Sequence, residues 1–147
     1  MDNAAIIRQI QDAWRDVAYP GDDKIFRRDS YDDEDIANYF GGTTWQGHDP
    51  VKLRAHSSAF TFFTPEAFHY WLPAFLTAAI ENPEEADVIV DYIPRSVSNE
   101  YAPNRWPLFS LSQRQAVAAY LRFQIEKFPD QASDERTALA ILERSRQ

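Results

Sequence analysis

The sequence predicts an all-α fold: one compact domain over residues 1–147, with about six or seven helices around a central, apolar, proline-kinked helix. Three observations predict it. A length of 147 residues fits one hydrophobic core. Apolar residues recur at the three- and four-residue spacing of a buried helical stripe. Helix N-caps followed by proline, which has no N–H to leave unpaired, occur at Asp49-Pro50, Thr64-Pro65 and Asn82-Pro83.

The N-terminal half is predicted as three helices and one extended segment. The first helix covers residues 3–17, with Ile6 and Trp14 on its buried stripe. A second short helix follows Ser30 and ends at Gly41-Gly42, and a third covers residues 50–58. Residues 59–63 are expected to be briefly extended, because Phe and Thr favour strands.

The most apolar helix is predicted over residues 65–81, and its lack of a polar face indicates that the others pack around it. Pro73 lies inside it and frees the carbonyl of His69, so we expect a kink near residues 69–73.

The C-terminal half is predicted as three further helices and one long connection. A fifth helix over residues 84–93 stops at Pro94, and residues 94–109 connect it to the next, held to the core by aromatic and leucine side chains. A capping box at residues 110–113 begins the sixth helix, which ends near Phe128, and a seventh covers residues 133–146.

The composition narrows the classes of partner and site. There are 23 Asp or Glu against 15 Lys or Arg, a formal net charge of −8, which disfavours nucleic acid and anionic membranes as ligands. The absence of cysteine excludes disulfides, thiolate zinc sites and thiol nucleophiles. No targeting segment is visible, and the longest uncharged apolar run, between Glu66 and Glu81, is too short to cross a bilayer, so we expect a cytoplasmic protein.

One long motif resembles a known family. Trp45, then Leu53, then TPEAFHYWLPAFL over residues 64–76 is similar to an uncharacterised bacterial family of unknown function, whose pattern is a Trp, a short helix and T-P-E-A-F-x-Y-Y-L-P-A-F-L. Leu111-Ser112 followed by Gln115 resembles a second block of that family. The resemblance covers about two-thirds of the chain, without the N-terminal helix and the acidic segment. It implies a fold, but no reaction and no catalytic residues.

One pattern suggests acid–base or metal chemistry. Glu66 and His69 lie three residues apart, a spacing that metal-binding helical bundles use, and His56 or the pair His48-Asp49 could converge on them. The simpler interpretation is that Glu66 complements the helix dipole and that His69 packs beside the kink. There is no serine-nucleophile motif and no glycine-rich phosphate loop, so we expect no cofactor.

An acidic segment offers a different kind of site. Its carboxylates are Asp29, Asp32, Asp33, Glu34 and Asp35, and residues 22–35 hold seven acids against three bases. The spacing does not fit a calcium-binding EF-hand loop. Two interpretations remain: a solvated face at a helix N-terminus, or a docking surface for a basic protein.

Two tryptophans in predicted loops are ambiguous in the same way. Trp45 and Trp106 either pin their loops to the core or stand exposed as interface anchors.

The favoured hypothesis for function is a non-enzymatic acidic protein that binds a basic protein, as an immunity protein or antitoxin neutralises an effector. The alternatives are a small metal-dependent or acid–base hydrolase centred on Glu66, His69 and His56, and a structural homodimer subunit.

Overall fold

The computed structural model describes residues 2–25, 33–98 and 102–144, without the side chains of residues 33–35 and 102. All regular secondary structure in these ranges is helical, which confirms the all-α prediction. Five of the described helices exceed ten residues: α1 (Asn3–Ala13), α5 (Pro65–Glu81), α7 (Val88–Ser98), α9 (Leu111–Lys127) and α10 (Ser133–Arg144). The shorter elements are η1 (Asp22–Lys24), α2 (Asp33–Phe40), α3 (Pro50–Ala55), α4 (Ala59–Phe62), α6 (Pro83–Ala86), α8 (Ala102–Arg105), η2 (Trp106–Leu108) and η3 (Pro129–Gln131).

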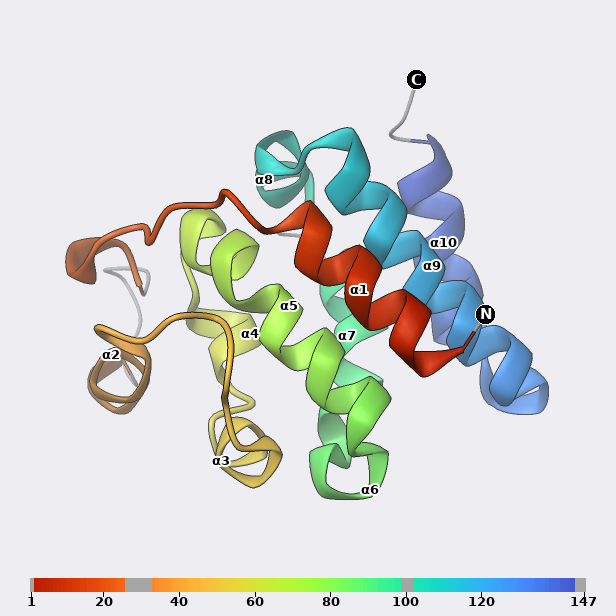
Figure 1. Cartoon of the computed structure of the whole chain (residues 1–147), viewed down its shortest axis with the longest axis horizontal. Helices are drawn as coiled ribbons and strands as arrows, with labels where there is room; N and C mark the ends of the chain where they lie inside the picture. Colours follow the sequence, from red (N-terminus) through yellow and green to blue (C-terminus); the bar gives the residue numbers. More distant parts are fainter. Residues whose placement is uncertain (1, 26–32, 99–101, 145–147) are drawn as a thin grey trace.

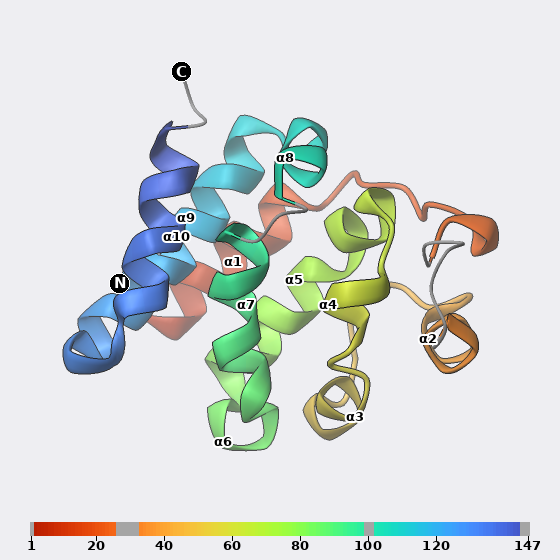
Figure 2. The ribbon, with the colours of Figure 1, turned by 180° about the vertical axis from the view of Figure 1, so that it is seen from behind.

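Helix α5 lies at the centre of the domain, as its apolar sequence predicts. It runs diagonally through the molecule with α1 on one face and α7 on the other, while α9 and α10 lie to one side and α2 and α3 to the other (Figures 1 and 2). Trp71, Phe75 and Leu76 of α5 are fully buried. The core therefore surrounds this helix on all sides.

Proline at position 73 does not interrupt α5, because the carbonyl that it frees finds another donor. The helix continues from Pro65 to Glu81, and the indole Nε1–H of Trp14 donates to the backbone oxygen of His69 at 2.9 Å. A buried carbonyl without a partner would cost free energy, so this bond from α1 stabilises the helix at its weakest point.

Side-chain caps begin several helices as predicted. Thr64 accepts from the N–H of Ala67 at 3.0 Å at the start of α5, and Ser110 and Gln113 form a complete capping box on α9. Asp49 caps α3. The side chain of Asn82 makes no capping bond within the described chain, so that part of the prediction is wrong, although Pro83 does begin α6.

The extended segment predicted at residues 59–63 is wrong: Ala59–Phe62 is the short helix α4. Ala59, Phe60 and Phe63 are all buried, and their spacing of three and four residues is that of one helical face. Packing against the core therefore outweighs the strand preference of Phe and Thr.

Further boundaries differ from the predictions, and the helix predicted over residues 50–58 ends at Ala55. Helix α1 ends at Ala13 instead of residue 17, because Trp14 turns inward as its C-cap. The helix predicted over 84–93 is two helices, α6 and α7, and α7 passes through Pro94 to Ser98. Buried Ile93 and Val97 lie on either side of that proline and hold the helix to the core.

The long connection predicted over residues 94–109 is mostly wrong as well. It contains the end of α7, then α8 and η2. Trp106 and Phe109 are buried and pin it as expected, but Leu108 is exposed. No helix among the described residues is long and apolar enough to cross a membrane.

Candidate functional site

A cavity of about 320 Å³ lies where α6 and α7 meet the C-terminal part of the chain, and we call it the acid-lined cavity. Helices α7 and α10 pack directly against each other, with α6 at the start of α7 (Figure 2). The residues that line the acid-lined cavity come from α5, the α6–α7 hairpin, α9, η3 and α10: Ala79, Pro83, Glu84, Asp87, Val90, Asp91, Gln124, Lys127, Phe128, Gln131 and Glu135.

The lining carries four carboxylates, Glu84, Asp87, Asp91 and Glu135, against one ammonium, Lys127. Across the described parts of the chain, no basic side chain forms an ion pair with any of the four. A neighbouring carboxylate that does not line the cavity, Asp134, is paired with Arg95 at 3.3 Å. The cavity therefore concentrates negative charge that its own residues leave unpaired.

The local fold explains how three of these carboxylates come together. Pro83 starts α6 and Asp87 ends it with a positive φ of 49°. This turn starts α7 at Val88, so Glu84 of α6, Asp87 of the turn and Asp91 of α7 border the same cavity. A positive φ is rare for a residue with a Cβ, so the turn carries backbone strain beside the carboxylates.

Gln124 of α9 is the polar residue in the lining that lacks a full set of partners. It is only 4% exposed. Its Nε2–H donates to the hydroxyl of Tyr120 at 3.1 Å, while its Oε1 has no hydrogen-bond partner in the described structure. A buried acceptor without a donor costs free energy, so an N–H or O–H group that reached this oxygen would remove that cost.

The carboxyl group of Glu135 is unusual among the four, because its residue is only 8% exposed. Burial raises its pKa, and the negative charges of Asp134 and Asp91 raise it further. The same surroundings raise the pKa of the fully buried Tyr120 hydroxyl, mainly by desolvation. A positive charge in the cavity would favour the ionised form of Glu135.

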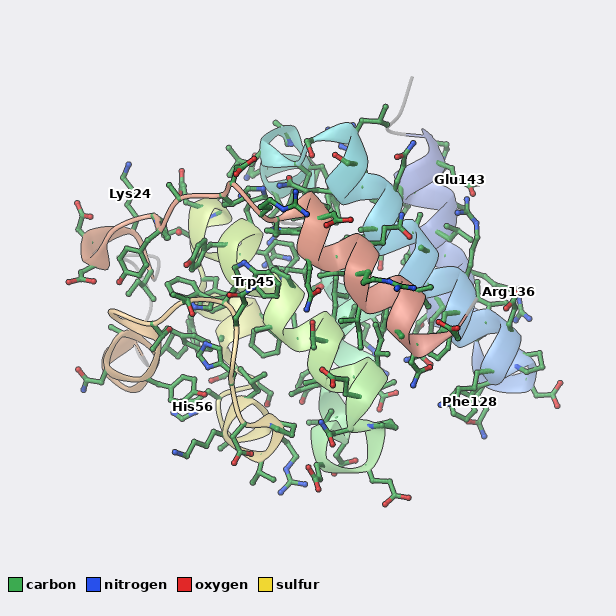
Figure 3. The ribbon with its side chains drawn as sticks, in the orientation of Figure 1. Lys24, Trp45, His56, Phe128, Arg136 and Glu143 are labelled. Carbon is green, nitrogen blue, oxygen red and sulfur yellow. The ribbon has the colours of Figure 1, made fainter. Side chains whose placement is uncertain are left out.

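The rim of the cavity is partly aromatic. Phe128 is 44% exposed and projects at the end of α9, away from the core (Figure 3). The ammonium of Lys127 lies 5.6 Å from the Phe128 ring centroid and 5.4 Å from that of Phe123. The rim therefore holds a cation against aromatic faces.

The acidic segment predicted from the sequence falls largely outside the described residues. Asp29 and Asp32 lie there entirely, while Asp33, Glu34 and Asp35 form the first turn of α2 without described side chains. Their role in partner binding stays a prediction.

The two candidate tryptophan anchors are buried. Trp45 is 8% exposed and lies over α5 (Figure 3). Trp106 is 5% exposed, and its Nε1–H donates to the carbonyl of Val97 at 3.3 Å. This geometry matches the interpretation of residues that pin their segments to the core, and it leaves little tryptophan surface for a partner.

The structure does not bring Glu66, His69 and His56 together as a site. His69 packs on Phe109 and donates from Nε2 to the Oε1 of Gln113 at 2.8 Å. His56, labelled in Figure 3, is on the side of the molecule that carries α2 and α3, where it stacks on Tyr39 with ring centroids 4.3 Å apart. Glu66 is exposed. Within the described ranges, no three His, Asp or Glu side chains are grouped so that they could hold a metal ion.

The acid-lined cavity was missed from the sequence, although part of its signal is present. Glu84, Asp87 and Asp91 follow the three- and four-residue spacing of one helical face, but solvated surface charges commonly show the same spacing. Gln124 and Glu135 are more than thirty residues further along the chain and carry no local signal. They come together because α10 packs against both α7 and α9.

The sequence matches the model of a protein family whose function is unknown. It is the model of DUF6714, a family of unknown function, and it matches residues 2–144. The chain belongs to this family. The resemblance indicated by the central motif is thereby confirmed, and the match extends further than predicted, over the N-terminal helix and the acidic segment of this DUF6714 protein. No curated protein and no solved structure was found to match the chain.

Proposed function

We propose that this DUF6714 protein acts by binding a basic protein partner, with the acid-lined cavity as the centre of the contact. The observation that carries the proposal is the set of four carboxylates that no described basic side chain pairs, at a cavity that also holds an unpartnered acceptor. A partner with clustered lysines or arginines supplies the missing charge. The net charge of −8 adds long-range attraction to the same class of partner.

An immunity- or antitoxin-like role in the cytoplasm fits this chemistry. An effector that acts on nucleic acid carries a basic surface that binds phosphates. A protein that blocks this effector gains affinity by placing carboxylates at the positions where the phosphates of the substrate bind. The exposed carboxylates Glu84, Asp87 and Asp91 lie on the surface where such a contact forms. The acidic segment that starts α2 would form a second contact with the same partner.

Affinity capture from the native host followed by measured affinity tests the proposal. The cavity variant carries Glu84→Lys and Asp91→Lys; the matched control carries Asp16→Lys and Glu66→Lys, the same change in net charge at exposed positions that lie outside both the cavity and the acidic segment. We expect the captured partner to be basic and its Kd to weaken at least about tenfold in the cavity variant, but only about two- to threefold in the control.

Ionic strength supplies the second readout. Affinity for a basic partner should fall as salt rises from 50 to 200 mM, because screening weakens contacts between exposed charges. A partner that is not basic, an affinity insensitive to salt, or an equal loss in both variants contradicts the proposal.

No specific contact in the described structure favours either alternative, the hydrolase or the homodimer subunit. The hydrolase needs Glu66, His69 and His56 to converge, and the described contacts place the two histidines in different aromatic clusters. The homodimer remains testable by sedimentation: a mass that does not change with concentration and corresponds to one chain of 17.0 kDa contradicts it.

A further inference from the structure

We infer that the acid-lined cavity binds a primary alkylammonium group, supplied by a lysine side chain of the partner; this rests on the proposed function and names the group that its central site receives. Two independent features of the cavity point to such a ligand. One is the unpaired negative charge of Glu84, Asp87, Asp91 and Glu135. The other is the side chain of Gln124, which lines the cavity and carries a buried Oε1 acceptor without a donor.

The charge of the lining decides the sign of the ligand. Four carboxylates face one ammonium, so an anion is repelled and a cation is attracted. A small metal ion is a poor candidate, because no three acidic or histidine side chains in the described chain are grouped closely enough to coordinate one. An organic cation does not need that close convergence, since it donates hydrogen bonds to acceptors spread around it.

The shape and chemistry of the walls favour ammonium on a methylene chain. Ala79, Pro83, Val90 and Phe128 give the cavity apolar surface, against which a methylene chain can pack. An ammonium carries three donors in a tetrahedral arrangement, which suits acceptors on four different elements: α6, α7, α9 and α10. A guanidinium prefers two parallel acceptors on one carboxylate, and Glu135, the buried carboxylate of the lining, already accepts a backbone hydrogen bond of its own.

Lys127 shows how such a group is accommodated at the entrance. Its ammonium lies over the Phe123 and Phe128 rings at 5.4 and 5.6 Å. It lines the cavity without pairing with the four carboxylates among the described contacts. A second ammonium entering the cavity would meet the repulsion of Lys127, so removal of this charge is expected to strengthen binding.

The test uses small probes on the folded protein. N-acetyl-lysine methylamide is titrated while the side-chain amide resonances of Gln124 are followed by NMR, with N-acetyl-arginine methylamide, N-acetyl-norleucine methylamide and cadaverine as comparison probes. A ligand of this size is expected to bind with a Kd on the order of 1 mM. We expect the lysine probe to bind most tightly, the norleucine probe not to bind, and the arginine probe to bind at least about threefold more weakly than the lysine probe.

Matched variants assign the contacts. Gln124→Leu nearly keeps the size of the side chain but removes the acceptor. With binding followed in this and the other variants by the backbone amide resonances of Asp91 and Glu135, lysine-probe binding should weaken about tenfold, the fold-change expected for loss of a hydrogen bond to a charged group. Gln131→Leu changes an exposed amide of the same lining and should leave the Kd within about twofold. Lys127→Met should strengthen binding about two- to threefold.

The outcomes separate this inference from the proposed function. If cadaverine binds more than about tenfold tighter than the lysine probe, the ligand is a free polyamine and the lysine assignment is overturned. If no ammonium probe shifts Gln124 while a basic partner still binds in a cavity-dependent manner, the inference fails and the proposed function stands. If the lysine probe binds as expected but no basic protein does, the proposed function fails while the ammonium site stands.

Discussion

The hydrogen bond from Trp14 to the backbone of His69 helps to make Pro73 tolerable inside the central helix. The indole Nε1–H of Trp14 donates at 2.9 Å to the carbonyl that proline leaves without its usual donor. Trp14 is 1% exposed, so water cannot easily replace it. The stability of α5 therefore depends on a residue fifty-five positions earlier in the chain.

Trp14→Phe tests this dependence. Phenylalanine keeps an aromatic ring in the core but has no N–H, so the His69 carbonyl becomes an unsatisfied buried acceptor. We expect the free energy of unfolding in urea to fall by about 1–3 kcal/mol. Trp45→Phe, at a tryptophan whose indole N–H has no partner among the described contacts, serves as control and should cost less. Equal losses in the two variants would show that ring volume, and not the hydrogen bond, is what matters.

Replacing Glu135, in contrast to Trp14, is expected to stabilise the protein. Its raised pKa means that the folded state binds its proton more readily than the unfolded chain. Its contribution to stability is therefore present at low pH and is lost as the pH rises through the folded-state pKa. Glu135→Gln removes the ionisable group and should raise the free energy of unfolding at pH 7.5, with a smaller gain at pH 4. A variant less stable than the parent at pH 7.5 would contradict this account.

At the scale of elements, the sequence predicts where helices begin better than it predicts whether a helix continues through a proline. Thr64-Pro65, Asp49-Pro50 and the Ser110–Gln113 box mark helix starts because cap and partner are close in sequence. Pro94 was expected to end a helix, yet α7 passes through it. What keeps α7 helical is contact with α5 and α10, and those contacts have no local signature.

The hairpin between α6 and α7 depends on the strained backbone of Asp87. Its φ of 49° and ψ of −112° suit glycine, which has no Cβ to clash. We expect Asp87→Gly to raise the free energy of unfolding by about 1 kcal/mol, measured by urea denaturation. Asp87→Ala removes the same carboxylate without relieving the backbone, and should not reproduce the gain. If alanine stabilises as much as glycine, charge repulsion at the cavity and not strain is the cause.

At the scale of the whole molecule, burial of histidines predicts how stability changes with acidity. Desolvation lowers the pKa values of His48 and His69 from the ordinary value of 6.5, against smaller opposing hydrogen bonds to Thr44 and Gln113. The unfolded chain then binds more protons than the folded one just below pH 6.5. Stability is therefore complete above that pH and is lost as the pH falls towards the folded-state pKa values.

Two measurements check this expectation. In the Glu135→Gln variant, which removes the opposing contribution of that carboxyl group, urea denaturation should give a lower free energy of unfolding at pH 5 than at pH 7.5. NMR titration of the ring protons should give pKa values below 6.5 for both His48 and His69. A flat stability profile together with unshifted ring titrations would show that the two rings are solvated.

The sequence indicates the net charge of the molecule far better than the place where its carboxylates gather. Net charge is a sum over residues, so order along the chain is irrelevant to it. The acid-lined cavity needs Asp91, Gln124 and Glu135 to meet, and that meeting follows from how α7, α9 and α10 pack. Clusters built in this way are visible only in three dimensions.

The hydrogen bond between Trp14 and His69 also affects the order in which the protein can fold during its synthesis. During synthesis the ribosome releases α1 first, but its acceptor in α5 emerges some fifty residues later, and Gln113, which donates to the carbonyl of Ala13 at 3.1 Å, later still. The nascent first helix has no native partner during that interval. Release of the last third of the chain is therefore needed before the domain can close.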